Sequence, residues 1–157
     1  MALCPAAILI VDDDSSEVEL ITRAFRKAGF TNAICAVHDG QSAIRYLQGD
    51  DEYRDRVRFP LPGVVVLDHK MPGSDGWEVL QWVRGKSEQS FAVVVFSGSN
   101  NPDYERKALE LGANAYYLKP QDFDEYMSVI KRIAELWVKS DRAGAESPAL
   151  ENRFRAT

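Results

Sequence analysis

Short, continuous apolar runs alternate along this chain with stretches in which apolar residues recur every three or four positions. The apolar runs lie at 6–11, 33–37, 63–67, 91–96 and 114–118. Runs of this kind are typical of parallel strands that are covered on both faces. The intervening stretches have the period of amphipathic helices. The pattern therefore predicts five strand–helix units in succession.

Residues that favour helix ends bracket the helical stretches. The predicted helix starts are Ser16-x-x-Glu19, Asp39, Asp75-x-x-Glu78, Asn101-Pro102 and Asp122-x-x-Glu125. Gly29 and Gly112 are placed to end the first and fourth helices. The polar connection from Gly49 to Pro62 is long for a compact domain, which indicates either a functional loop or an extended helix end. Residues 139–157 carry glycine, proline and scattered charges, and we expect this tail to be poorly ordered.

The order of the elements limits the fold. Alternating strands and helices favour a parallel sheet with helices on both faces, and right-handed crossovers leave few topologies. Acidic residues follow the first and third strands, so we expect these two strands to be neighbours at the point where the winding reverses. The prediction is an α/β, flavodoxin-like, doubly wound sheet of five parallel strands in the order 2-1-3-4-5, with five helices, forming one domain over residues 6–138.

Composition narrows the function classes. The chain has 157 residues and a formal net charge of −5, so it lacks the basic character of a nucleic-acid-binding domain. No stretch reaches the ~18 apolar residues that a membrane-spanning helix needs, and we expect a cytoplasmic protein without membrane contact. Cys4 and Cys35 form neither a metal-binding nor a disulfide pattern.

Four of the five predicted strands end on a side chain suited to phosphoryl chemistry. Three acids, Asp12 to Asp14, follow the first strand, Asp68 follows the third, Ser97 the fourth and Lys119 the fifth. Strand ends of an open α/β sheet are where sites form. Mg²⁺ prefers carboxylate oxygens, and a carboxylate attacks phosphorus well when the charge of the phosphoryl group is neutralised. The set predicts Mg²⁺-assisted phosphoryl transfer onto an aspartate.

Four motifs at these strand ends resemble those of the receiver domains of two-component response regulators (CheY-like). They are Ile10-Val11-Asp12-Asp13, Leu67-Asp68 with Met71-Pro72-Gly73-x-Asp75-Gly76, Val95-Phe96-Ser97-Gly98, and Tyr116-x-x-Lys119-Pro120. The resemblance covers roughly residues 6–138. The polar loop near Tyr53-Arg54 and the helix ending Leu136-Trp137 are similar to the single-domain regulators that serve bacterial phytochromes.

The resemblance implies a role for the acidic residues. Asp68 is the implied phosphoacceptor, and Asp12 and Asp13 join it in holding Mg²⁺ together with the backbone carbonyl of Lys70. Asp14 either contacts the metal or supports the first turn of the following helix. His69 and Lys70 depart from the usual apolar and variable residues after the acceptor, and Lys70 is placed to pair with Asp14 or with a phosphoryl oxygen.

The resemblance also implies how the phosphoryl group is held and sensed. Lys119 and Ser97 bind its oxygens, and the Lys119–Pro120 bond corresponds to a cis peptide in the family. Tyr116 is the implied switch residue, whose rotamer changes when Ser97 moves toward the phosphoryl group. A static, half-buried strand tyrosine is the alternative for Tyr116.

The implied function is that of a phosphoacceptor signalling protein, not an enzyme acting on other substrates. A sensor histidine kinase, by the narrower resemblance a phytochrome, or a phosphotransfer protein donates the phosphoryl group. The ~19 residues after the fifth helix are too few for a DNA-binding module, so we expect output through contact with a downstream protein target.

The fifth predicted helix suggests a homodimer face. One predicted core stripe comprises Phe123, Tyr126, Met127, Ile130, Ala134 and Trp137, and Val129, Ile133 and Leu136 widen it beyond what one sheet face covers. A stripe this wide is either a broad core face or a dimer surface of the fourth helix, fifth strand and fifth helix.

Two other functions compete. Asp12-x-Asp14 after a strand matches the nucleophile spacing of haloacid dehalogenase-type phosphatases, but that reading leaves Asp68 unexplained. A pseudo-receiver that binds partners without phosphorylation is the other alternative, against which the complete set of acceptor, metal and lysine positions argues.

Overall fold

The computed structural model describes residues 6–68, 70–71, 74–85 and 91–138, with backbone only for 70–71 and 74–75. The elements, in chain order, are β1 (Ala7–Val11), α1 (Ser15–Lys27), β2 (Ile34–Val37), α2 (Gly40–Gln48), the 3-10 helix η1 (Asp51–Arg54), β3 (Pro62–Leu67), β4 (Lys70–Met71), β5 (Ser74–Asp75), α3 (Trp77–Arg84), β6 (Ala92–Ser97), α4 (Pro102–Glu110), β7 (Ala115–Leu118) and α5 (Phe123–Trp137). His69, the Pro72-Gly73 step and the predicted disordered tail lie outside the described residues.

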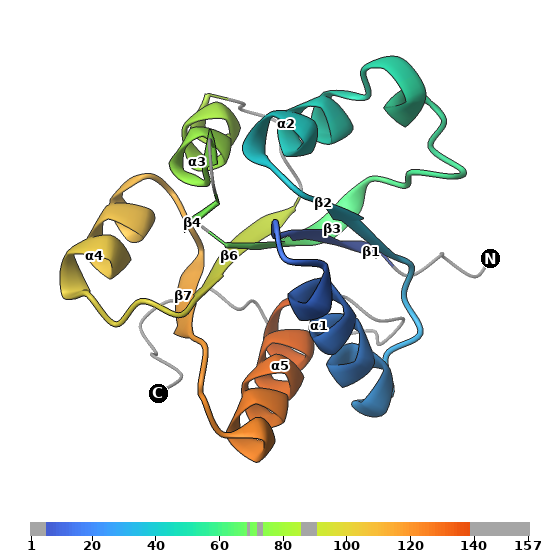
Figure 1. The fold of residues 1–157 in the computed structure, drawn as a ribbon. Coiled ribbons are helices and arrows are strands. Elements are labelled where there is room, and N and C mark those ends of the chain that lie inside the picture. The colour runs from blue at the N-terminus through green and yellow to red at the C-terminus, as the bar shows by residue number, and fades with distance from the viewer. Residues whose placement is uncertain (1–5, 69, 72–73, 86–90, 139–157) are drawn as a thin grey trace.

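Five strands form one parallel sheet in the order β2-β1-β3-β6-β7 (Figure 1). This is the predicted 2-1-3-4-5 order of the five main strands, and the five predicted helices are present. Val11 at the end of β1 lies opposite both Val37 of β2 and Leu67 of β3, which places the ends of these three strands side by side. The small antiparallel pair β4–β5 after β3 was not predicted.

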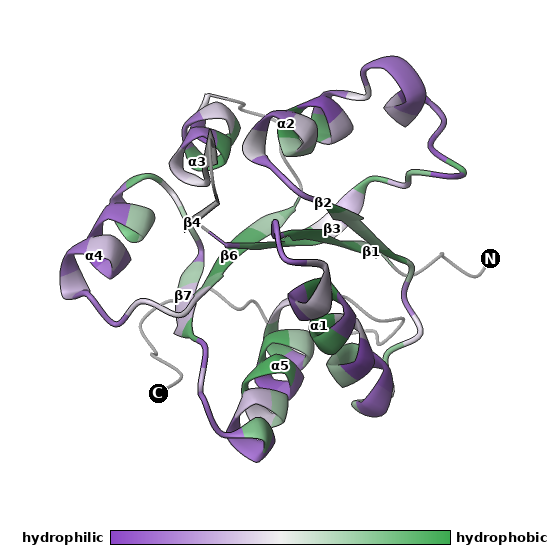
Figure 2. Cartoon of the chain, in the orientation of Figure 1, coloured by the Kyte–Doolittle hydropathy of each residue, from purple (hydrophilic) through white to green (hydrophobic). Residues whose placement is uncertain are grey.

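Helices cover both faces of the sheet, which explains why its strands are continuously apolar. Figure 1 shows α1 and α5 side by side on one face and α2, α3 and α4 on the other. Alternate residues of β1 enter different cores: Leu9 packs on the side of α2 and α3, and Ile8 and Ile10 pack on the side of α1 and α5. The apolar strands and the polar outer faces of the helices are visible in Figure 2. Each face therefore has its own hydrophobic core, and the sheet separates them.

Helix starts agree with the sequence at three places and differ at two. Asp39, Asn101 and Asp122 cap α2, α4 and α5 through side-chain bonds to backbone amides, as predicted. The cap of α1 is Asp14 and not Ser16, because the Asp14 carboxylate accepts from the amides of Ser16 and Glu17. The predicted cap of α3 by Asp75 is also wrong. Asp75 pairs with Lys70 in the β4–β5 ladder, and Gly76, which has no side chain with which to cap, holds the cap position.

The connection from Gly49 to Pro62 is not an extension of α2, which ends at Gln48. It contains η1, and the buried Tyr53 packs its ring 5.1 Å from that of Tyr46 and 5.0 Å from that of Phe59. The Tyr46 hydroxyl donates to the carbonyl of Pro60 at 2.8 Å. The polar residues of this segment therefore surround a small aromatic cluster that holds it against α2.

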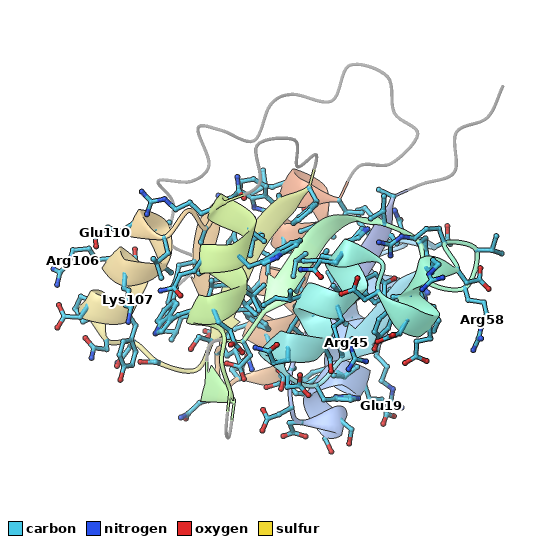
Figure 3. The ribbon with its side chains drawn as sticks, turned by 90° about the horizontal axis from the view of Figure 1, so that it is seen from above. Glu19, Arg45, Arg58, Arg106, Lys107 and Glu110 are labelled. Carbon is cyan, nitrogen blue, oxygen red and sulfur yellow. The ribbon has the colours of Figure 1, made fainter. Side chains whose placement is uncertain are left out.

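The apolar stripe of α5 is mainly a core face. Tyr126, Val129, Ile130, Ile133, Ala134 and Trp137 are buried. The prediction that Phe123 belongs to the core is wrong, because this first residue of the helix is 54 % exposed. Charged side chains on the outer side of α4, such as Arg106 and Glu110, point outward (Figure 3). None of the helices in the described part of the chain combines the length and apolar character that crossing a membrane requires.

Candidate functional site

The parallel hydrogen-bond ladder continues past the ends of the strands into the site. The amide of Asp12 donates to the carbonyl of Val37 at 3.1 Å, and the amide of Asp68 donates to the carbonyl of Val11 at 2.9 Å. Both bonds extend the pairing of β1 with its two neighbours by one residue. The backbones of the two aspartates are therefore fixed by the sheet, and only their side chains remain to be oriented.

Three aspartates converge at this edge of the sheet. Asp12, Asp13 and Asp68 each present a carboxylate oxygen, and the three oxygens lie within 4.8 Å of one another. Asp12 is 2 % exposed, Asp68 is half-buried and Asp13 is exposed, so the cluster opens to solvent on one side. Such an all-oxygen set, open to water, fits a hard divalent cation that keeps several water ligands. The backbone of Lys70 lies in β4, two residues beyond Asp68, and its carbonyl stays a predicted ligand.

Asp14 supports the helix instead of joining the cluster. One of its oxygens accepts from the amide of Ser16 at 2.9 Å and from that of Glu17 at 3.4 Å. A side chain engaged with two amides at a helix start satisfies donors that the helix cannot satisfy itself. Of the two roles left open by the sequence, the structure supports capping.

Burial governs the electrostatics of Asp12. Loss of solvent raises the pKa of the Asp12 carboxyl above its ordinary value, and this outweighs the opposing effects of the Asp14 amide and of Lys119. The amide of Asp14 donates to Asp12 at 3.0 Å. A nearby cation favours the ionised form of a carboxyl group. A positive charge in addition to that of Lys119 would therefore stabilise the ionised form of Asp12.

Lys119 brings its ammonium group into contact with three carboxylates. Its Nζ lies 3.2 Å from Asp12, 3.1 Å from Glu17 and 3.8 Å from Asp68. Burial alone lowers the pKa of Lys119, but the three carboxylates outweigh it and the net pKa is raised. The ammonium therefore stays charged at neutral pH. The resemblance implied a cis bond before Pro120, but no peptide bond among the described residues is cis, and Lys119 points inward from a trans bond.

Two residues at the site, Glu17 and His38, were missed by the sequence analysis. The Glu17 carboxylate, on the first turn of α1, pairs with Lys119 and accepts a hydrogen bond from the hydroxyl of Tyr126 on α5. The Nδ1 atom of His38 lies 3.0 Å from the carbonyl oxygen of Asp12, where a protonated ring nitrogen donates. Neither residue belongs to a motif, because each acts through a partner brought close only by the sheet. The acidic start of α1 next to the aspartates was the one available signal for Glu17.

Ser97 and Tyr116 meet at the loop after β6. Ser97 is 1 % exposed, and its hydroxyl oxygen accepts from the amide of Ser99 at 3.1 Å. The Tyr116 hydroxyl donates to the carbonyl of Ser99 at 2.6 Å, and the ring is buried. Burial raises the pKa of this hydroxyl, with smaller effects from Ser97 and Glu105. The two residues are thus adjacent, with Tyr116 packed inward.

The described geometry therefore brings Asp12, Asp13, Asp68 and Lys119 together, with Ser97 at the end of the adjoining strand. The predicted pairing of the Lys70 side chain and the position of His69 lie outside the described residues. Comparison with known proteins agrees with this geometry: a family model described as the response regulator receiver domain matches residues 8–131. This chain belongs to the response regulator receiver domain family. The match covers both the aspartate cluster and the Ser97 and Lys119 positions of this receiver.

Several known proteins are similar to this receiver along most of their length. The probable methanogenesis regulatory protein FilR2 of Methanothrix harundinacea is 34% identical over 140 residues, 88% of each chain. The response regulator RPA3017 in red light signaling of R. palustris has a TM-score of 0.80 at 26% identity, with 90% of this chain and 96% of that chain covered.

Two solved structures similar to this receiver differ in their bound states. One is the phosphorylated cyanobacterial phytochrome response regulator RcpA, with a TM-score of 0.76, 28% identity and coverage of 84% and 93%. The other is the Mn²⁺-bound form of the response regulator Rcp1, with a TM-score of 0.76, 26% identity and coverage of 87% and 96%. A divalent metal thus fits the aspartate cluster, and this receiver is a two-component signalling domain. The comparisons give no support to a phosphatase of the haloacid dehalogenase type or to a pseudo-receiver.

Proposed function

We propose that this receiver accepts a phosphoryl group on Asp68, with Mg²⁺ held by Asp12, Asp13, Asp68 and the carbonyl of Lys70. The observation that carries the proposal is the convergence of three aspartate oxygens within 4.8 Å. The Lys119 ammonium lies 3.8 Å from the same Asp68 carboxylate. Half-burial leaves Asp68 accessible to a phosphoryl donor from solvent.

The chemistry follows from these positions. An oxygen of Asp68 forms a bond to phosphorus while the bond from phosphorus to the donor histidine nitrogen breaks, and the electron pair stays on that nitrogen. Bound Mg²⁺ supplies charge neutralisation for the phosphoryl oxygens. Lys119 contributes a second positive charge. The Ser97 hydroxyl oxygen accepts from the Ser99 amide, and its own proton is the proposed donor to a phosphoryl oxygen. The receiver thereby catalyses only its own phosphorylation and dephosphorylation.

The partner that fits this receiver best is a sensor histidine kinase, and we propose a phytochrome. Support comes from the similarity to RcpA, whose description names it a phytochrome response regulator, and from the red-light regulator RPA3017. The net charge of −5 does not suit direct nucleic-acid binding, so the proposed output is contact with a downstream protein in the cytoplasm.

The proposed output surface comprises α4, β7 and α5, and it also serves as the candidate homodimer face. Exposed apolar side chains on it include Leu109 of α4 and Phe123 of α5, which are 37 % and 54 % exposed. Val129 and Ile133 were predicted to widen the apolar face of α5 available for a dimer, but they do not contribute to this surface because both are buried in the core. Tyr116 lies on β7 of this surface and adjoins Ser97, so it is the proposed switch residue.

The test is labelling by acetyl phosphate with and without Mg²⁺, followed by peptide mapping of the acyl phosphate. Wild type should be labelled on Asp68 only when Mg²⁺ is present. Asp68→Asn should not be labelled, because an amide does not attack phosphorus. Asp103→Asn, which removes an exposed carboxylate on α4, is the matched control and should be labelled like wild type. Labelling of Asp68→Asn at the wild-type rate would contradict the proposal.

A further inference from the structure

We infer that Glu17 is a positioning residue: it holds Lys119 back from Asp68 in the unphosphorylated receiver, and through Tyr126 it connects that lysine to α5. The inference rests on the proposed function, because it concerns what Lys119 does before and after Asp68 is phosphorylated. It adds a second connection from the site to the outer helices, separate from Ser97 and Tyr116.

The distances show where Lys119 rests. Its Nζ lies 3.1 Å from a Glu17 oxygen and 3.2 Å from an Asp12 oxygen, but 3.8 Å from Asp68. The ammonium therefore sits between Glu17 and Asp12, and its contact with the acceptor is the longest of the three. To bind a phosphoryl group on Asp68, the ammonium must shift toward that side chain, at the expense of the contact with Glu17.

Charge makes Glu17 a competitor for Lys119. A phosphoryl group, or the analogue beryllofluoride, adds negative charge beside Asp68. The Glu17 side chain is 21 % exposed, so water screens its charge only in part. A carboxylate in this position stabilises the resting place of Lys119 and repels the incoming group. Removing the charge of Glu17 should therefore favour the phosphorylated arrangement.

Tyr126 connects this competition to α5. Its hydroxyl donates to the second oxygen of Glu17, while its ring is buried against Phe96, with ring centroids 5.2 Å apart. α1 and α5 lie side by side on the same face of the sheet (Figure 1). When Lys119 moves toward Asp68, the Glu17 carboxylate loses its ion pair and keeps the hydrogen bond from Tyr126. That hydrogen bond must then strengthen or rearrange. Phosphorylation of Asp68 therefore changes the hydrogen bonding of Tyr126 on α5.

The chain offers a matched pair of variants for the test. Glu17→Gln keeps the side-chain length and an oxygen that accepts from Tyr126, but it removes the charge. Glu19→Gln removes the same charge from the same helix at an exposed position at the outer edge of the molecule (Figure 3). The difference between the two variants therefore isolates the contact of Glu17 with Lys119 from the net charge of the protein.

The first measurement is calorimetric titration of beryllofluoride into each protein in the presence of Mg²⁺. Glu17→Gln should bind about fivefold more tightly than wild type, at the low end of coupling between sites. Glu19→Gln should bind like wild type. Equal affinities for Glu17→Gln and Glu19→Gln overturn this inference alone. A wild type that does not bind beryllofluoride overturns the proposed function and, with it, the inference.

The second measurement reports on Tyr126 itself. In protein labelled with ¹³C at the tyrosine ζ carbon, the Tyr126 resonance is assigned by its loss in Tyr126→Phe. It should shift on beryllofluoride binding in wild type and shift much less in Glu17→Gln, while the Tyr116 resonance still responds. A Tyr126 resonance that does not move in wild type contradicts the link to α5. Tyr126→Phe should also tighten beryllofluoride binding, by less than Glu17→Gln, because Glu17 then loses its anchor but keeps its charge.

Discussion

The backbone amide of Lys119 donates a hydrogen bond of 2.7 Å to the carbonyl oxygen of Ser97. This bond joins the ends of β6 and β7 one residue beyond the last strand pair, Ser97 with Leu118. The two residues that are proposed to hold the phosphoryl oxygens are therefore fixed to each other through their backbones.

Metal binding should depend on Asp13 and not on Asp14. Asp13→Asn should weaken Mg²⁺ binding at least tenfold, because Mg²⁺ has few protein ligands here and a neutral amide is a poorer ligand than a carboxylate. Asp14→Asn removes a charge one residue away but keeps a side chain that caps helices well. It should bind Mg²⁺ within a few-fold of wild type. Mg²⁺ titration by calorimetry compares the two; equal losses in both variants would show that only general charge matters.

Mg²⁺ binding should weaken with acid at an unusually high pH. The pKa of Asp12 is raised by burial, so in the metal-free protein this carboxyl takes up a proton before an exposed aspartate does. Protons and the metal compete for the same oxygens. Affinity should therefore be constant near neutral pH and fall as the pH drops toward the raised pKa. The check is a series of calorimetric titrations from about pH 8 down to about pH 3, across the ordinary aspartate range; a fall that begins only below that range contradicts the prediction.

Tyr116→Ala should separate phosphorylation from output. Asp68 should still be labelled, because Tyr116 bonds to Ser99 and contributes no metal ligand. Self-association or partner binding should no longer respond, because the aromatic side chain between Ser97 and the surface is missing. Analytical ultracentrifugation with and without beryllofluoride and Mg²⁺ measures the response.

Tyr116→Phe serves as the conservative control for this experiment. It keeps the ring and loses only the bond to the Ser99 carbonyl, so it should retain part of the response. If wild type itself shows no change in association or partner affinity, the switch role of Tyr116 is wrong even where Asp68 is the acceptor. The inward packing of Tyr116 in the present structure means that the ligand is expected to shift the population of rotamers.

Gly63→Ala should destabilise the fold. Gly63 lies on β3, the central strand of the sheet. A Cβ added there would lie 2.5 Å from the Cβ of Ala6. Overpacking of this kind costs about 1–3 kcal/mol. Gly98→Ala is the control, because a Cβ there meets nothing within 4 Å. Urea unfolding of both variants measures the difference, and equal midpoints would show that Ala6 moves aside at little cost.

The strands and their order were predictable because both faces of the sheet are covered. Continuous apolar runs follow directly from that burial, and the acids after β1 and β3 marked the neighbouring strands. Helix boundaries were less predictable where several capping residues stand together. Asp14 and Ser16 are both good caps, and only the backbone conformation decides that Asp14 is used. Phe123 fits the helical period of the α5 stripe, but as the first residue of the helix it lies beyond the packed part and stays exposed.

The site was predictable as far as its residues follow strands. Asp12, Asp68 and Lys119 are each the first residue after a strand, so topology alone brings them together. Glu17 is different, because it lies within a helix. Whether its side chain faces the site depends on how α1 is oriented about its own axis. The sequence predicts the partner of Glu17, Tyr126, as an ordinary core residue of α5. Nothing in the sequence indicates which group the Tyr126 hydroxyl contacts. Contacts between helix side chains therefore do not follow from the order of the strands.

The contact between Lys119 and Asp12 joins residues 107 positions apart. Closing so long a stretch of chain costs entropy before any contact offsets it, and sheets built from distant strands fold slowly for this reason. During synthesis, the aspartates leave the ribosome long before β7, so the nascent chain carries an acidic cluster without its lysine. On the proposed function, we expect a chain to accept a phosphoryl group efficiently only after β7 has docked and brought Lys119 to Asp12 and Asp68.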